Sequence, residues 1–264
     1  MSNSKEYRLE AFGKLLDILD CLREKCPWDR KQTNESLRCN TIEEVYELSN
    51  ALLKSETDEI KKELGDVLLH IVFYSKIADE KGQFDIADVC DALCQKLIYR
   101  HPHVFGEVSV KGSDEVEDNW EQLKLKEKDG NKTVLSGVPE ALPALIKAER
   151  IQEKAAHAGF DWEKPEDVWK KVKEEIGEVE AELRSDDTKR REDEFGDLLF
   201  SIINAARLYK VNVENALEHT NRKFIDRFNY IERRAKEQGK TVNQLELAEM
   251  DALWNEYKRS IESR

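Results

Sequence analysis

The stretch EFGDLLFSIINAA, residues 194–206, decides the fold class of this chain. Its apolar residues follow Phe195 at the three- and four-residue spacing of a buried helix face. Two acids, Glu194 and Asp197, stand three residues apart at its start, with a glycine between them. A similar string, ELGDVLL, occurs at residues 63–69. The pattern predicts a buried helix that carries an acidic pair, and it predicts that such a helix occurs twice in the chain.

The composition favours an all-α protein. Of the 264 residues, 39% are hydrophobic and 38% are charged, which suits apolar cores beneath well-solvated outer helix faces. With only 5 Pro and 11 Gly, the chain lacks the frequent tight turns of an all-β protein. The net charge of -13 argues against a nucleic-acid partner, which would require a basic face, and is compatible with metal cations.

The N-terminus and the cysteines bear on the location of the protein. The start, MSNSKEYRLE, has no apolar signal segment, and no apolar run approaches the length of a membrane span. All 5 cysteines occur in the first part of the chain, and none forms a CxxC pair. We expect reduced, partly buried thiols, no zinc site, no membrane partner and a cytoplasmic location.

Four acids of the first half recur in the second half at one constant offset. EEVYE at residues 43–47 corresponds to EEIGE at residues 174–178, and ELGD corresponds to EFGD. Further along, KLIYR at residues 96–100 corresponds to KFIDR at residues 223–227. Self-similarity of this kind indicates a tandem duplication.

The duplication predicts two helical domains, 1–130 and 142–264, joined by a linker at 131–141. The linker falls in a stretch that holds most of the local Gly, Pro and Ser. Periodicity predicts four or five helices in each half, and their apolar stripes predict that the halves complete their cores in a homodimer. The predicted ranges are 5–25, 41–55, 57–81, 85–100 and 113–128, then 142–158, 165–185, 188–209, 212–238 and 243–262.

The spacing of the acids predicts a metal site. Glu175 and Glu178 share one helix face, and Glu194 and Asp197 share a face of the next helix. A short polar turn joins these helices, so we expect them to pack antiparallel and to bring the carboxylates together. Carboxylates this close repel one another unless cations neutralise them, and oxygen ligands select Mg²⁺ first and Mn²⁺ second. The first half retains all four acids, as Glu44, Glu47, Glu63 and Asp66, which leaves a second metal site there as an open alternative.

Basic side chains accompany the acids of the second half. Lys171 lies four residues before Glu175 on the same face, and Lys223 and Arg227 share a face of a later helix. Cations beside a metal–carboxylate cluster suit a phosphate chain. The first half has Asn40 where the second has Lys171, which predicts that the two halves differ in function.

Three further residues have alternative interpretations. Trp254 and Lys258 share a face of the last helix, where an aromatic plane beside a cation can hold a base and its phosphate. A half-buried Trp in an amphipathic helix explains the same spacing equally well. Gly196 points away from the acids, and we expect it to admit a neighbouring helix, because glycine costs about 1 kcal/mol against alanine there.

Taken together, EExxE followed by ExxD, with the string RHPHVF at residues 100–105, resembles the MazG family of nucleoside triphosphate pyrophosphohydrolases over the whole chain. The resemblance implies an all-α tandem repeat of two four-helix-type units that dimerises. It also implies Mg²⁺-dependent cleavage of NTPs and dNTPs between the α and β phosphates, giving a nucleoside monophosphate and pyrophosphate.

The resemblance places the chemistry in the second domain. The metal ligands that it implies are Glu175, Glu178, Glu194 and Asp197, and the nucleotide contacts are Lys171, Glu174, Arg190, Lys223, Arg227, Trp254 and Lys258. Bound Mg²⁺ would polarise the phosphoryl oxygens and activate a water, which either Glu175 or Glu178 orients or deprotonates. Lysine and arginine would stabilise the charge that develops during transfer, and we expect Lys171, Lys223 and Arg227 to take this role.

Other classes fit the sequence less well. A ferritin-like di-iron oxidase needs Glu-x-x-His pairs, and none of the 5 histidines has a glutamate three residues before it. An HD-type phosphohydrolase needs adjacent His and Asp, and a P-loop enzyme needs GxxxxGK[ST]; both motifs are missing. The remaining alternative is a non-enzymatic helical interaction module with acids as surface decoration.

Overall fold

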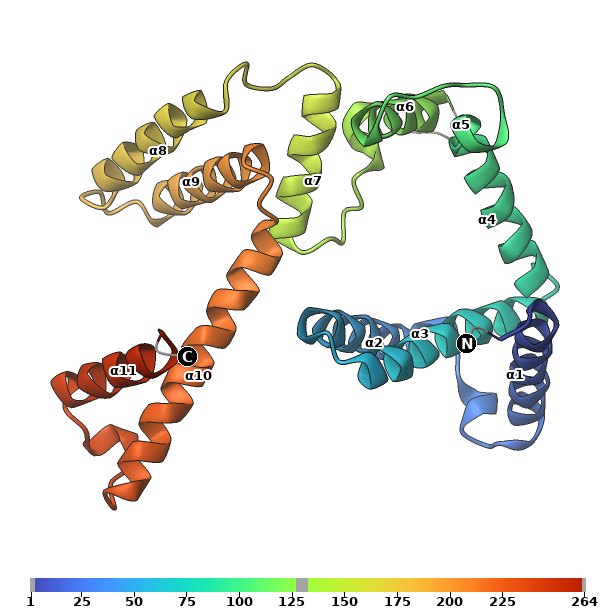
Figure 1. Cartoon of the computed structure of the whole chain (residues 1–264), viewed down its shortest axis with the longest axis horizontal. Coiled ribbons are helices and arrows are strands. Elements are labelled where there is room, and N and C mark those ends of the chain that lie inside the picture. Colours follow the sequence, from blue (N-terminus) through green and yellow to red (C-terminus); the bar gives the residue numbers. More distant parts are fainter. Residues whose placement is uncertain (1–2, 127–132, 263–264) are drawn as a thin grey trace. The chain divides into compact units, whose positions relative to one another are not determined.

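The computed structural model describes residues 3–126 and 133–262, and within them every regular element is a helix (Figure 1). The predicted all-α class is confirmed. The chain divides into two compact units, Met1–Gly112 and Ser113–Arg264. The helix at 113–126 therefore groups with the second unit, because it contacts the first long helix of that unit.

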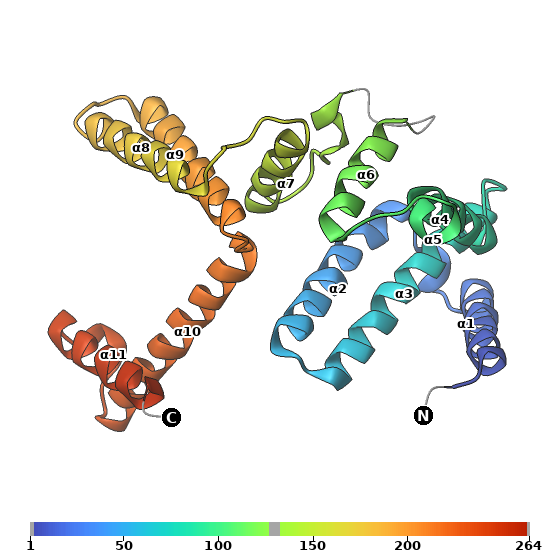
Figure 2. The same ribbon diagram turned by 45° about the horizontal axis from the view of Figure 1, so that its top comes forward.

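The first unit is built around an antiparallel helix pair, α2 and α3, which lie side by side (Figure 2). Its elements are α1 (Lys5–Lys25), η1 (Asp29–Lys31), α2 (Asn34–Lys54), α3 (Thr57–Asp79), α4 (Ile86–Arg100) and α5 (Pro102–Phe105). Its core residues are Leu19, Leu37, Val72, Phe73 and Ile77. The core thus joins α1 to one end of the α2–α3 pair.

The second unit repeats this pair as α8 and α9, which also lie side by side (Figure 1). Its elements are α6 (Ser113–Lys126), η2 (Val134–Gly137), α7 (Ala144–His157), η3 (Pro165–Asp167), α8 (Val168–Glu182), α9 (Thr188–Leu208), α10 (Val213–Glu237), η4 (Val242–Gln244) and α11 (Leu247–Glu262). The last helix, α11, folds back along α10. One core cluster joins α8 to α9, and another joins α10 to α11.

Three predicted helix starts are wrong. Helix α2 begins at Asn34 rather than at residue 41, because Thr33 and Ser36 form a capping box that satisfies two free N–H groups. The helix predicted from residue 165 begins as a 3-10 turn, and α8 starts only at Val168. The helix predicted from residue 243 also begins with a 3-10 turn, and α11 starts only at Leu247. The remaining helices occupy their predicted positions with small differences at their ends, and residues 127–128 of one prediction lie outside the described residues.

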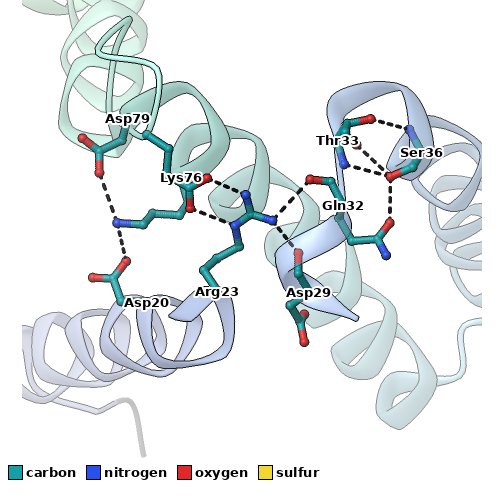
Figure 3. A network of polar contacts seen from close by, with 9 residues as sticks. Asp20, Arg23, Asp29, Gln32, Thr33, Ser36, Lys76 and Asp79 are labelled. Atoms are coloured by element: carbon teal, nitrogen blue, oxygen red, sulfur yellow. Dashed lines mark hydrogen bonds and ion pairs between the residues drawn. The ribbon is translucent and has the colours of Figure 1, made fainter. Parts of the chain in front are cut away.

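An arginine anchors the segment between α1 and α2 (Figure 3). Arg23 donates from Nε and Nη2 to the carboxylate of Glu80, which follows α3. Its Nη1 donates to the backbone oxygens of Asp29 and Gln32. Lys76 adds an ion pair between α3 and α1. These contacts hold the loop that leads into α2 against the end of α3.

The described residues include no candidate membrane span, and their thiols are unpaired. None of the helices there combines the length and the apolar character that crossing a bilayer demands. All five thiols in the described chain are free. The expectation that they are partly buried holds for Cys26 and is wrong for Cys21, Cys39, Cys90 and Cys94, which are exposed.

Candidate metal and nucleotide site

The packing of α8 against α9 brings three of the predicted metal ligands together. One carboxylate oxygen from each of Glu175, Glu194 and Asp197 lies within 4.8 Å of the other two. Glu175 is buried, Glu194 is half-buried and Asp197 is exposed. This acidic group, which we call the second-unit cluster, therefore reaches from the helix interface to the surface.

Glu178 lies one turn further along α8, exposed and outside the group of three. Its pKa is raised, chiefly because a protonated Glu178 can hydrogen-bond to Glu175, and burial and the charge of Glu175 add to this. When Glu178 is ionised, both carboxylates can only accept hydrogen bonds, so neither can donate one to the other. Glu175 Oε2 is buried and has no hydrogen-bond partner among the described residues. The site thus holds more negative charge than its protein partners neutralise.

Lys171 is the one basic side chain paired with the second-unit cluster in the described part of the chain. Its Nζ lies 2.6 Å from Glu175 Oε1 and 2.8 Å from an oxygen of Glu174. These hydrogen bonds raise the pKa of Lys171, which stays charged at neutral pH. The predicted proximity of Lys171 and Glu175 is confirmed, but one positive charge leaves an excess of carboxylates.

The other predicted nucleotide contacts form a second group, on α10 and α11. The Arg227 guanidinium lies 5.0 Å above the centre of the Trp254 ring, in the geometry of a cation–π contact. Lys223 and Lys258 are exposed on the same two helices. Among the described residues, no ion pair joins Lys223, Arg227 or Lys258 to the second-unit cluster. Arg190 lies at the start of α9, and its Nε is 3.6 Å from Asp187 Oδ2.

Trp254 also has a structural role. It is half-buried and packs against the core cluster that joins α10 to α11. Phe224, an aromatic residue that sequence reasoning missed, lies edge-on to Trp254 with ring centres 5.1 Å apart, and it is 57% exposed. Its position three residues before Arg227 is the signal that could have identified it.

The first unit repeats the acidic geometry. One oxygen from each of Glu44, Glu63 and Asp66 lies within 4.8 Å of the other two, and here Glu63 is the buried member. Burial raises the pKa of Glu44, and the charges of Asp66, Glu47 and Glu63 raise it further. Glu47 is exposed and outside the group of three, as its counterpart Glu178 is in the second unit. We call this group the first-unit cluster.

The glycines inside the two acidic strings have no close neighbour. A Cβ atom added at Gly65 or at Gly196 would meet nothing within 4 Å in the described structure. The expectation that Gly196 admits a neighbouring helix is therefore wrong for the contacts within this chain.

Comparison with known proteins identifies the family. The family model described as MazG nucleotide pyrophosphohydrolase domain matches residues 32–105 and again residues 163–231. The chain is 43% identical over 250 residues to the Nucleoside triphosphate pyrophosphohydrolase/pyrophosphatase MazG of Thermotoga maritima, covering 94% of this chain and 95% of that protein. It is 40% identical over 258 residues to the Nucleoside triphosphate pyrophosphohydrolase of Escherichia coli K12, covering 95% of this chain and 98% of that protein.

A third relative is about twice as long as the segment that matches this chain. The chain is 46% identical over 237 residues to the Uncharacterized protein YabN of Bacillus subtilis, covering 89% of this chain but 48% of that protein. Both repeated units of the present chain match the family model, so the duplication that the two acidic strings predict is confirmed. The chain therefore belongs to the MazG family of nucleotide pyrophosphohydrolases.

Proposed function

We propose that the chain cleaves NTPs and dNTPs between the α and β phosphates, releasing a nucleoside monophosphate and pyrophosphate. The observation that carries the proposal is the convergence of Glu175, Glu194 and Asp197 beside Lys171. Relatives from Thermotoga maritima and Escherichia coli that are named nucleoside triphosphate pyrophosphohydrolases align with nearly the whole chain, which supports the proposal. A metal-binding group next to a phosphate-binding cation is what phosphoryl transfer requires.

Mg²⁺ is the cofactor that we propose, with Mn²⁺ as a substitute. The donors at the second-unit cluster are all carboxylate oxygens, which hard divalent cations prefer, and the buried Glu175 Oε2 lacks a partner among the described residues. Glu175, Glu194 and Asp197 would hold the ion, and Glu178 stays a predicted ligand at the edge of the group. When bound, Mg²⁺ polarises phosphoryl oxygens and makes water more acidic.

Other side chains of the second unit would bind the phosphates, activate the water and stabilise the leaving group. Lys171 would exchange its pairing with Glu175 for a phosphate oxygen once the carboxylates have another cation. Glu178 lies outside the group of three and next to Glu175, so we assign to it the role of orienting the attacking water or taking its proton. Charge that develops on the leaving pyrophosphate would be stabilised by Lys223 and Arg227.

We propose that Trp254 and its neighbours hold the nucleotide. An aromatic ring with a guanidinium over its face offers stacking for a base and charge for a phosphate. Lys258, Glu174 and Arg190 are the further contacts that we assign, each on an exposed position. We propose that the catalytic domain spans residues 142–264. The N-terminal domain would then span residues 1–130, and residues 131–141 would form the linker between the two domains.

We also propose a homodimer. Large apolar side chains are exposed along α8, α9 and α10, namely Ile176, Phe195, Leu199, Ile202, Phe224 and Ile225. Continuous apolar faces on helices of a folded chain mark association surfaces. The open space at Gly196 adds to this, because the glycine has no close neighbour within the described chain. Light scattering at micromolar concentration is expected to give twice the 30.7 kDa chain mass, and a single-chain mass would contradict the proposal.

A cytoplasmic location is part of the same proposal. Four exposed free thiols persist in a reducing compartment, whereas oxidising compartments pair such groups.

Product analysis tests the proposed reaction. The chain is incubated with ATP or dGTP in the presence of Mg²⁺, and the phosphate products are separated. Pyrophosphate together with the monophosphate is expected. Orthophosphate would show that a different bond is cleaved, and no product with either nucleotide would favour the helical interaction module.

A further inference from the structure

Four of the nucleotide contacts assigned above come from two different helices. Lys223 and Arg227 lie on α10, whereas Trp254 and Lys258 lie on α11. Figure 1 shows α11 folded back beside the C-terminal part of α10. The distances among the four side chains therefore depend on how α11 is aligned along α10. A shift of α11 would separate Arg227 from the ring of Trp254.

Apolar packing holds the two helices together, but directional contacts are needed to fix their alignment. The core between the helices consists of Ile231, Ala235, Leu245 and Leu253. Apolar burial is non-directional, so a small rotation of α11 costs little while the same area stays buried. Hydrogen bonds weaken steeply when their geometry is poor. We therefore looked for a polar contact between α10 and α11.

A hydrogen bond between side chains joins α10 to α11. The Tyr230 hydroxyl donates to Glu256 Oε1 at 2.6 Å, and Arg234 Nη2 lies 3.8 Å from the same oxygen. A carboxylate acceptor makes such a bond shorter and stronger than a bond between neutral groups. The hydrogen bond to Glu256 raises the pKa of Tyr230, and burial and the charge of Glu256 raise it further. The hydroxyl therefore keeps the proton that it donates.

The ring of Tyr230 is held from several sides. It packs against the core cluster that joins α10 to α11. Arg233 Cζ lies 5.1 Å from the ring centre, and the ring centre of Tyr257 lies at the same distance of 5.1 Å. A ring that is held in this way aims its hydroxyl in one direction, so Glu256 can accept only when α11 is correctly aligned.

The hydrogen bond lies close to the nucleotide contacts along both helices. Tyr230 follows Arg227 by three residues, which is about one turn of α10. Glu256 lies between Trp254 and Lys258 in the sequence of α11. A movement of α11 that breaks the hydrogen bond therefore also displaces Trp254 and Lys258.

The part of α10 that carries Tyr230 has no counterpart among the described helices of the first unit. Helix α4 ends at Arg100, which corresponds to Arg227, whereas α10 continues to Glu237. After Arg100 the chain turns into the short helix α5. Both partners of the hydrogen bond thus belong to a helical hairpin found only in the unit to which we assign cleavage.

We propose that Tyr230 and Glu256 are positioning residues for nucleotide binding. Their hydrogen bond fixes the alignment of α11 on α10, which sets Trp254 beside Arg227 and places Lys258 for a phosphate. The inference rests on the proposed function, because the nucleotide contacts are those assigned there. Neither residue belongs to the second-unit cluster, so loss of the hydrogen bond weakens nucleotide binding and leaves the cleavage step unchanged.

Steady-state cleavage of ATP by variants of the full chain tests the proposal. Tyr230→Phe removes the donor and Glu256→Ala removes the acceptor, so each is expected to raise KM about fivefold and to leave kcat within about twofold. Glu256→Gln keeps an acceptor oxygen and should recover most of the affinity that Glu256→Ala loses. Tyr257→Phe is the matched control, because it removes the hydroxyl of the neighbouring ring, and it should leave KM unchanged.

The double variant Tyr230→Phe/Glu256→Ala separates one shared contact from two independent losses. If both residues act through one hydrogen bond, the double variant raises KM no further than either single variant does. An increase of about 25-fold, the product of the two single effects, would show that the residues act independently and would overturn the proposal.

Nucleotide binding is measured separately from cleavage. Calorimetry uses an ATP analogue with a methylene group between the α and β phosphates, which resists the proposed cleavage, and circular dichroism checks that each variant is helical. The Kd of the analogue should rise in Tyr230→Phe and Glu256→Ala as KM does. Equal Kd values in Tyr230→Phe and Tyr257→Phe, or a loss confined to kcat, would overturn the proposal.

The two measurements also distinguish this inference from the proposed function. If the unaltered chain binds the analogue but releases no pyrophosphate from ATP, the proposed cleavage is wrong, and the Kd values of the variants still decide the roles of Tyr230 and Glu256. If the unaltered chain does not bind the analogue, both proposals are wrong.

Discussion

The two helix pairs, α2–α3 and α8–α9, carry the same acids but neutralise them differently. In the second unit, Lys171 comes from the first helix of the pair and contacts the buried Glu175. In the first unit, Lys62 comes from the second helix and contacts the buried Glu63. The buried glutamate therefore lies on the second helix of the pair in the first unit and on the first helix of the pair in the second unit. The duplicated acidic motif thus places the carboxylates alike in both units, while the lysine that pairs with the buried glutamate differs between them.

The largest expected effect separates the two units by their exposed glutamates. Glu178→Ala is expected to reduce NTP cleavage by about a hundredfold or more, since one lost catalytic interaction removes about 3 kcal/mol of transition-state stabilisation. Its counterpart Glu47→Ala is the matched control and should leave most of the activity. Steady-state kinetics measures NTP cleavage by both variants. Equal losses of activity in the two variants, or a larger loss in Glu47→Ala, would contradict the assignment of cleavage to the second unit.

The lysines sharpen the same comparison. Lys171→Ala is expected to lower kcat/KM for NTP about tenfold, because a phosphate oxygen loses a charged donor. Lys62→Ala removes the equivalent charge from the first-unit cluster and should change kcat/KM by less than about twofold. A loss of activity in Lys62→Ala as large as in Lys171→Ala would mean that both units contribute to cleavage.

Divalent metal should stabilise the fold. A cation that binds only the native chain at about ten times its Kd adds about 1.4 kcal/mol to the free energy of unfolding, which raises Tm by about 3 °C. Thermal unfolding is followed in EDTA and in Mg²⁺ at matched ionic strength. The Glu175→Gln/Glu194→Gln variant should keep part of the shift if the first-unit cluster binds metal. An identical Tm in EDTA and Mg²⁺ for the unaltered chain would argue against preformed clusters.

The smallest expected effect concerns two ion pairs. One joins Arg23 to Glu80, and in the other Arg207 Nη1 donates to Asp161 Oδ2 at 3.0 Å. Hydrogen bonding to Arg23 lowers the pKa of Glu80 from 4.5, against the opposing effect of burial. Burial by itself raises the pKa of Asp161, but hydrogen bonds from Arg207 and from the Trp162 N–H outweigh it and lower the pKa below 3.8. Both acids are ionised and paired at neutral pH.

The sign of the pH dependence follows. A lowered carboxyl pKa stabilises the fold above the unfolded value, and this contribution is lost as pH falls through the folded value. Partial exposure limits each pair to about 1 kcal/mol. The free energy of unfolding is measured in urea as the pH is lowered. Below about pH 4.5, Glu80→Gln should lose less of this free energy than the unaltered chain does. Asp161→Asn should also lose less than the unaltered chain, but only below about pH 4. Parallel curves for variant and unaltered chain would show that these pairs contribute nothing.

Much of the site was accessible from sequence because helical spacing is a local property. Acids three residues apart share a face, and a short turn between two amphipathic helices enforces antiparallel packing. The convergence of Glu194 and Asp197 with Glu175 followed from those two rules. The start of α2 was missed because Thr33 and Ser36 cap it with side-chain hydrogen bonds that apolar periodicity does not reveal.

The sequence by itself determined the helical class, the duplication and the acidic positions, since each depends on the order of residues along one or two helices. Only the tertiary structure decided which glutamate of each unit is buried and that Arg227 lies over Trp254. These outcomes depend on how one helix packs on another. Burial and the contact between Arg227 and Trp254 arise from side chains that meet across a helix interface, and local spacing does not specify which side chains meet there.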